Sequence, residues 1–84
     1  LKGLTKLERL GLSVTKISDA GLVHLAGLTN LKALHLDTTQ VTDAGLEHLK
    51  GLTKLQRLNL SVTKVTDAGV KKLQQALPNC KIRR

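Results

Sequence analysis

The stretch "LTKLERLGLSVTKISDAGLVHLAG", residues 4–27, decides the fold because the chain repeats it twice more. Residues 28–51 read "LTNLKALHLDTTQVTDAGLEHLKG", and residues 52–75 read "LTKLQRLNLSVTKVTDAGVKKLQQ". A fixed period of this length is typical of a solenoid, in which each repeat forms one turn and packs against its neighbours. We therefore predict three stacked turns that share one core.

Each copy contains an alternating segment that predicts a short strand. In the first copy, Leu10 and Leu12 are separated by one residue, which places both side chains on the inner face of a strand. The other two copies keep this spacing. The side chains predicted to point outward, and so to form a candidate binding face, are Arg9, Gly11, Ser13, Ala33, His35, Asp37, Arg57, Asn59 and Ser61.

A short helix is predicted after each strand. A hydroxyl residue followed by aspartate provides an N-cap oxygen and a carboxylate at the positive end of a helix. Apolar residues three positions apart, such as Leu22 and Leu25, share one helical face. The expected N-caps are Ser18, Thr42 and Thr66, and the expected C-caps are Gly27 and Gly51.

An alanine–glycine pair follows the aspartate in every copy, at residues 20–21, 44–45 and 68–69. Glycine inside a helix costs about 0.5–1 kcal/mol relative to alanine, so another requirement must favour it. Because small residues let neighbouring backbones approach closely, we predict that the pairs allow tight helix stacking between turns. The glycine spacing of a phosphate-binding loop is absent from the sequence.

With this period and these leucine positions, the whole chain resembles the leucine-rich repeat superfamily, in a form close to its ribonuclease-inhibitor-like and cysteine-containing classes. The resemblance implies an α/β solenoid with parallel strands on the concave side and short helices on the convex side. It also implies partner recognition on the concave face. We expect one domain over residues 1–84, with repeats at 4–27, 28–51 and 52–75 and a closing segment at 76–84.

Threonine occupies, in all three copies, a position that is usually asparagine or cysteine in this superfamily: Thr15, Thr39 and Thr63. The resemblance places this position in the turn after the strand, where its side chain bonds backbone groups. A hydroxyl donates one hydrogen bond and accepts others. We predict a structural ladder in which the three threonines join the turns, each contributing roughly 1 kcal/mol.

The two ends of the chain depart from the repeat. Leu1–Gly3 matches Leu49–Gly51, the tail of a predicted helix, so the chain is expected to be a truncated C-terminal piece of a longer array with an uncapped first turn. Ala76–Arg84 is expected to form a vestigial fourth strand that closes the solenoid. Cys80 takes an apolar position there, and we expect a small buried side chain and no reactive thiol.

Composition limits the classes of function. The 84 residues carry a net charge of +8 and no Phe, Trp, Tyr or Met, so aliphatic side chains must build the core. The single cysteine excludes an internal disulfide. No apolar run is long enough to span a membrane, and no signal-peptide pattern opens the chain. The chain as given is expected to be soluble, and its sequence indicates no compartment.

Catalysis, a metal and a cofactor are not expected. His24 and His48 occupy equivalent helix positions, but two imidazoles alone do not complete a zinc site. His35 and Asp37 lie near serines in the manner of a hydrolase triad. An open sheet, however, supplies neither a pocket nor an oxyanion hole.

Protein binding through the outward strand residues is the function that we favour. One alternative is weak electrostatic binding of nucleic acid or another anionic surface, although the chain has no aromatic residue to stack on bases. Another is a structural, self-assembling or deliberately shortened array without a partner. The uncapped first turn also predicts a head-to-head homodimer in which two Leu7–Ser13 segments pair antiparallel.

Overall fold

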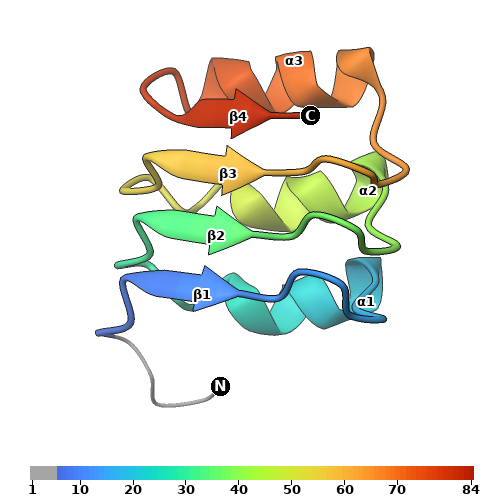
Figure 1. Cartoon of the computed structure of the whole chain (residues 1–84). Coiled ribbons are helices and arrows are strands. Elements are labelled where there is room, and N and C mark those ends of the chain that lie inside the picture. The colour runs from blue at the N-terminus through green and yellow to red at the C-terminus, as the bar shows by residue number, and fades with distance from the viewer. Residues whose placement is uncertain (1–5) are drawn as a thin grey trace.

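The computed structural model describes residues 6–84. The predictions that rest on Leu1–Gly3 and on Leu4 fall outside these described residues. Each described turn contributes one strand and one helical segment, and the turns stack in chain order (Figure 1). The predicted α/β solenoid is therefore confirmed.

Four short strands form one parallel sheet in chain order. The strands are β1 (Arg9–Gly11), β2 (Ala33–His35), β3 (Arg57–Asn59) and β4 (Lys81–Arg83). Neighbouring strands are in register at the period of the repeat, so that Leu10 pairs with Leu34, Leu34 with Leu58, and Leu58 with Ile82. The alternation in the sequence thus places the middle residue of each strand in one row that faces the core, and the residues on either side of it in rows that face away from the core.

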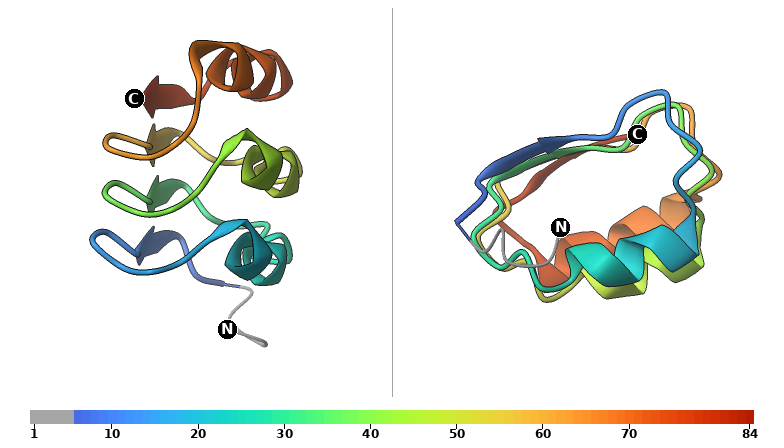
Figure 2. Two further views of the ribbon diagram at one scale, coloured as in Figure 1. Left: turned by 90° about the vertical axis from the view of Figure 1, so that its right-hand side faces the viewer. Right: turned by 90° about the horizontal axis from the view of Figure 1, so that it is seen from below.

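The helical segments cover one face of this sheet, as both views of Figure 2 show. The first two turns each combine a short α-helix with a 3₁₀ segment, and the third has a longer helix. The segments are α1 (Asp19–Leu22) with η1 (Val23–Leu25), α2 (Asp43–Leu46) with η2 (Glu47–Leu49), and α3 (Asp67–Ala76). Among residues 6–84 the helices cover only this face, and the other face of the sheet is open.

The third helix is longer because its last turn lacks the glycine of the earlier copies. Gln75 stands where the first two copies have glycine, and glutamine favours the helix. The amide of Gln74 then donates to the carbonyls of Leu77 and Cys80, at 2.9 and 2.8 Å, and fixes the turn into β4. The predicted fourth strand is confirmed, although Ala76, assigned to the closing segment, ends α3.

The core is a continuous stack of aliphatic side chains between the sheet and the helices. Leu34 and Leu58 from the strands and Leu22 and Leu73 from the helices are each at most 1% exposed. Cys80 packs in the same cluster, which confirms the prediction of a buried side chain. Burial raises the pKa of the Cys80 thiol, because the charged thiolate loses its hydration.

Two of the three predicted N-caps form. Thr42 Oγ1 accepts from the backbone N–H of Ala44 at 3.3 Å, and Thr66 Oγ1 accepts from that of Gly69 at 3.2 Å. The prediction for Ser18 is wrong, because its side chain makes no capping hydrogen bond. Both threonine hydroxyls are also bonded to an aspartate of the preceding turn, and within residues 6–84 no such aspartate meets Ser18.

The predicted glycine C-caps are also wrong. The 3₁₀ segments end at Leu25 and Leu49, and neither Gly27 nor Gly51 adopts the left-handed backbone that a glycine cap uses. The chain leaves each helical segment through a turn instead, in which the N–H of Leu28 donates to the carbonyl of Leu25 at 2.9 Å. These two glycines therefore mark a surface turn.

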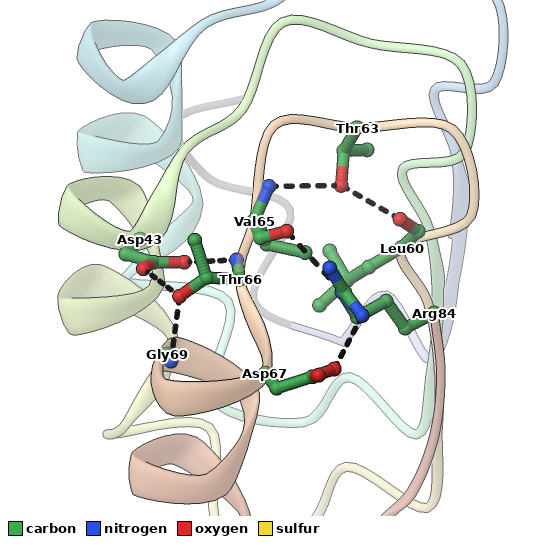
Figure 3. A network of polar contacts seen from close by, with 8 residues as sticks. All are labelled: Asp43, Leu60, Thr63, Val65, Thr66, Asp67, Gly69 and Arg84. Carbon is green, nitrogen blue, oxygen red and sulfur yellow. Dashed lines mark hydrogen bonds and ion pairs between the residues drawn. The ribbon is translucent and has the colours of Figure 1, made fainter.

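The threonine ladder does not join the turns, so that prediction is wrong as well. The hydroxyls of the three threonines donate within their own turn, at 2.7 Å, to the carbonyl three residues earlier. Because the threonine hydroxyl is attached only one carbon away from the backbone, it bonds this nearby carbonyl and not a group in the next turn. The pairs are Thr15 with Leu12, Thr39 with Leu36, and Thr63 with Leu60, the last drawn in Figure 3.

Aspartates join the turns instead. Asp43 of the second repeat accepts from the N–H of Thr66 at 2.7 Å and from its hydroxyl at 2.5 Å (Figure 3). Asp19 binds Thr42 through the same two groups. Each aspartate therefore bonds the residue that caps the next helix.

The last aspartate of the series has a different partner. Arg84 forms an ion pair with Asp67 and donates from Nε to the carbonyl of Val65 at 3.2 Å (Figure 3). The guanidinium takes the place that threonine holds at the earlier junctions. Arg84 thus gives Asp67 a side-chain partner, as threonine does for the two earlier aspartates.

The same aspartates explain the alanine–glycine pairs. A Cβ at Gly45 would overlap the Asp19 carboxylate and lie 2.9 Å from Leu22 Cδ1, and a Cβ at Gly69 would overlap the Asp43 carboxylate. The predicted close approach between turns is thus confirmed at these two positions. Glycine is required because an aspartate side chain of the preceding turn fills the space beside its Cα.

Candidate functional site

The open face of the sheet presents the predicted binding residues in aligned rows, and we call it the sheet face. Strand register places Arg9, Ala33 and Arg57 side by side in the first row. The second row contains Gly11, His35 and Asn59. The third row follows the strands and contains Ser13, Asp37 and Ser61. Of these nine residues, Arg9, Gly11, Ser13, His35 and Arg57 are exposed, and the others are half-buried.

The fourth strand extends this surface with two residues that the sequence prediction omitted. Lys81 is in register with Arg57, and Arg83 is in register with Asn59. Both side chains are exposed. The signal in the sequence was the predicted fourth strand itself, since a strand in register continues the rows of its neighbour. The first two rows therefore run across four strands.

One edge of the sheet face has a backbone conformation that the sequence does not suggest. Val14, Thr38 and Val62 follow the third-row residues and have positive φ angles of 55°, 56° and 56°. A β-branched residue is unfavourable there, by about 1–2 kcal/mol. Val14 and Val62 are nevertheless 75% and 77% exposed. These three residues, the rim of the sheet face, gain no core burial that would offset the strain.

Polar bonds fix part of the second and third rows. Ser13 donates from its hydroxyl to Asp37 Oδ1 at 2.6 Å, which links the first and second turns. The side-chain oxygen of Asn59 accepts from the N–H of Ser61 at 3.0 Å. These bonds restrict the side chains of Ser13, Asp37 and Asn59.

A shallow depression of about 590 Å³ lies over β3 and β4. Its lining residues are His35, Arg57, Leu58, Asn59, Lys81, Ile82 and Arg83. Three of its lining side chains, those of Arg57, Lys81 and Arg83, are positively charged. The depression is therefore basic in character.

The arrangement offers little for catalysis or metal binding. Asp37 takes its hydrogen bond from Ser13, and within residues 6–84 no hydrogen bond connects His35 to a serine or to Asp37. His24 and His48 lie on the helical side of the molecule, away from the sheet face. The described part of the chain contains no group of three or more potential metal ligands. Nor does it contain a helix with the length and apolar character needed to cross a membrane.

Comparison with known proteins agrees with this architecture. The family model described as "Leucine Rich repeat" matches residues 27–50 and 51–73, which together make up more than half of the chain. The first matched segment contains β2 with α2 and η2, and the second contains β3 and most of α3. No match was found among curated proteins.

A solved structure gives the same picture at the level of the fold. A leucine-rich repeat protein of Leptospira interrogans superposes with a TM-score of 0.67 at 22% sequence identity. The superposition covers 93% of this chain and 25% of that protein, so the chain spans about a quarter of its length. At this level of identity the likeness concerns the fold alone.

Proposed function

We propose that this chain, which belongs to the leucine-rich repeat family, binds a protein partner across its sheet face and catalyses no reaction. Domains of this family are generally protein-interaction modules, and the fold is generally non-catalytic. The proposal assigns the contact to the three rows on β1–β4 and to the rim. The helical side would face solvent.

The observation that carries the proposal is the register of the exposed side chains. Arg9, Ala33 and Arg57 come from different turns but stand in one row, held about 4.8 Å apart by parallel strand pairing. Side chains on a rigid sheet lose little freedom when a partner binds, which lowers the entropic cost of association. A pre-ordered surface of this kind suits a protein partner.

The strained rim supports the same conclusion. Val14 and Val62 combine an unfavourable backbone with exposed apolar side chains, and nothing in the core requires either property. Strain of this kind is concentrated at functional sites in other proteins. A partner that covers the rim would remove these side chains from water.

The test uses two histidines as a matched pair. Peptides selected from a displayed library against the 84-residue chain provide binders of defined sequence. We expect His35→Glu, on the sheet face, to weaken their binding about tenfold and His24→Glu, on the helical side, to leave it unchanged, because both are exposed and undergo the same change. Loss of binding with His24→Glu alone would contradict the proposal.

Self-association through the first turn is a second candidate function. Leu10 and Leu12 are only partly buried, whereas the equivalent Leu34 and Leu36 are 0% exposed. In addition, Leu12 N–H donates to His35 O at 2.8 Å, on the side of β2. Because successive residues of a strand point their N–H groups to opposite sides, the N–H of Gly11 points away from β2, toward the edge of β1 that no other described strand pairs with. A head-to-head homodimer of the 84-residue chain would cover both groups.

Sedimentation equilibrium across protein concentrations tests this dimer. Gly11→Pro removes the edge donor, and the position is open because no atom lies within 4 Å of a Cβ built there. We expect this variant to dissociate at concentrations where the parent chain is dimeric, while its melting temperature stays close to that of the parent. A parent chain that remains monomeric at high micromolar concentration excludes the dimer.

A further inference from the structure

Three cationic side chains gather on the last two strands of the sheet face. Arg57 on β3 is in register with Lys81 on β4, and Arg83 lies two residues further along β4 on the same face. All three are exposed. Adjacent strands lie about 4.8 Å apart, and residues two apart on a strand are separated by about 7 Å. We call Arg57, Lys81 and Arg83 the cationic cluster.

The cationic cluster has no internal counter-charge. Within residues 6–84 the ion pairs join Lys32 to Glu8 at 3.7 Å, Lys50 to Glu47 at 2.8 Å, and Arg84 to Asp67, and none includes a member of the cluster. Asp37, the acidic residue of the rows, likewise forms no ion pair with the cluster among the residues that the structure describes. Like charges therefore remain close together in the free protein, and a bound anion would relieve their repulsion.

The surroundings of the cluster suit a carboxylate. The cluster lines the depression of about 590 Å³, which is also lined by Asn59, a polar, neutral residue in register with Arg83. A guanidinium binds a carboxylate through two parallel hydrogen bonds, which adds geometric selectivity to charge attraction. The two arginines of the cluster supply two such forks.

The spacing of the cluster indicates the conformation of the ligand. In an extended peptide, side chains two residues apart project on the same side with a separation of about 7 Å. This is the separation of Lys81 and Arg83 on β4. A peptide with alternating acidic residues could therefore place consecutive carboxylates over consecutive cations.

We infer that the sheet face recognises an extended, acidic polypeptide segment, in which alternating Asp or Glu carboxylates bind Arg57, Lys81 and Arg83. This inference rests on the proposed protein-binding function and names the chemistry of the partner. A polypeptide is favoured over nucleic acid because the chain has no Phe, Trp or Tyr on which bases could stack.

The test measures fluorescence anisotropy with a labelled ten-residue peptide of alternating Glu and Ser. Arg57→Gln combined with Lys81→Gln removes two charges from the cluster, and Lys71→Gln combined with Lys72→Gln removes two exposed charges from α3. Glutamine removes the charge but keeps the first part of each aliphatic stem, and a thermal melt checks that each variant is folded. The two variants have equal net charge, so only the position of the lost charges differs.

We expect the cluster variant to bind the peptide at least tenfold more weakly than the parent chain, and the α3 variant to bind within twofold of it. Equal losses in both variants would overturn the inference, since they would indicate attraction by net charge alone. Tighter binding of an oligothymidylate with the same number of charges would also overturn it.

The same library selection separates this inference from the proposed function. Enrichment of neutral or basic peptides whose binding is lost with His35→Glu would refute the acidic partner while supporting the sheet face as a binding site. Binders that are insensitive to every sheet-face substitution would refute both. Enrichment of acidic peptides that require Arg57, Lys81 or Arg83 would support both.

Discussion

Asp43 and Thr66, which are 23 residues apart in the sequence, form two hydrogen bonds that connect consecutive turns of the solenoid. The backbone N–H of Thr66 donates to Asp43 Oδ1 at 2.7 Å, and its hydroxyl donates to Oδ2 at 2.5 Å. The hydroxyl oxygen in turn accepts from Gly69 N–H at 3.2 Å, at the start of α3. One carboxylate thus orients the cap of the next helix.

We expect Asp43→Ala to lower the free energy of unfolding by about 1–2 kcal/mol, because it leaves the Thr66 N–H without its acceptor and the cap without its orientation. Chemical denaturation measures this change. Asp37→Ala is the control, since Asp37 accepts a side-chain hydrogen bond from Ser13 and supports no helix cap. Equal destabilisation by the two substitutions would contradict a special role for the Asp43–Thr66 link.

The free energy of unfolding should depend on pH through the same Asp43 carboxylate. The hydrogen bonds from the Thr66 hydroxyl and then from the Thr66 N–H lower the pKa of Asp43 below its ordinary value of 3.8. Because the folded-state pKa is the lower one, the stabilisation is complete above about pH 4 and is lost as the pH falls through the folded-state pKa. Unfolding curves recorded between about pH 2 and pH 6 should therefore be less pH-dependent for Asp43→Asn. Parallel pH profiles of variant and parent would rule this out.

Two glycines should respond in opposite ways to alanine. A Cβ built at Gly69 would overlap the Asp43 carboxylate, whereas a Cβ built at Gly51 would have no neighbouring atom within 4 Å. We expect Gly69→Ala to lower the melting temperature, with a loss of about 1–3 kcal/mol from overpacking. Gly51→Ala should be neutral or should stabilise by up to about 1 kcal/mol, because alanine restricts the unfolded chain. Differential scanning calorimetry on both variants makes the comparison, and a neutral Gly69→Ala would be inconsistent with it.

The rim valines should be replaceable with a gain in stability. Val62 has a φ of 56°, and asparagine tolerates this conformation better than a β-branched residue does. We expect Val62→Asn to raise the free energy of unfolding by about 0.5–1 kcal/mol and to weaken binding of a partner that covers the rim. Val23→Asn is the control, because Val23 is also exposed but has a φ of −55°. A destabilised Val62→Asn would show that the strain is compensated elsewhere.

The fold could be predicted because it depends on features that recur in the sequence. The alternation of Leu10 and Leu12 and the fixed period specify the strands, their register and the helical side at once. The polar links could not be assigned in the same way. Asp19 and Thr42 meet only after the register is set, so the sequence indicated a local role for the aspartate and an inter-turn role for Thr39. In the structure the aspartates keep their place in the first helical turn and also join the turns, whereas Thr39 bonds only within its own turn.

The candidate site was predicted in part for the same reason. The rows through Arg9 and Gly11 follow directly from the alternation, and the structure aligns them. Lys81 and Arg83 were omitted because the leucine pattern weakens in the closing segment, although the segment itself forms β4. The positive φ at Val14 could not be predicted, since valine gives no sign of a left-handed backbone.

The most direct test of a partner-binding sheet face is chemical-shift mapping on the isotopically labelled chain, titrated with a selected binder that saturates it. We expect the largest amide shifts to fall on β1–β4 and the rim, including His35, Arg57 and Val62, while α1, α2 and α3 change little. Shifts concentrated on the exposed helical residues, such as His24 and Lys71, with the strands unchanged, would contradict it.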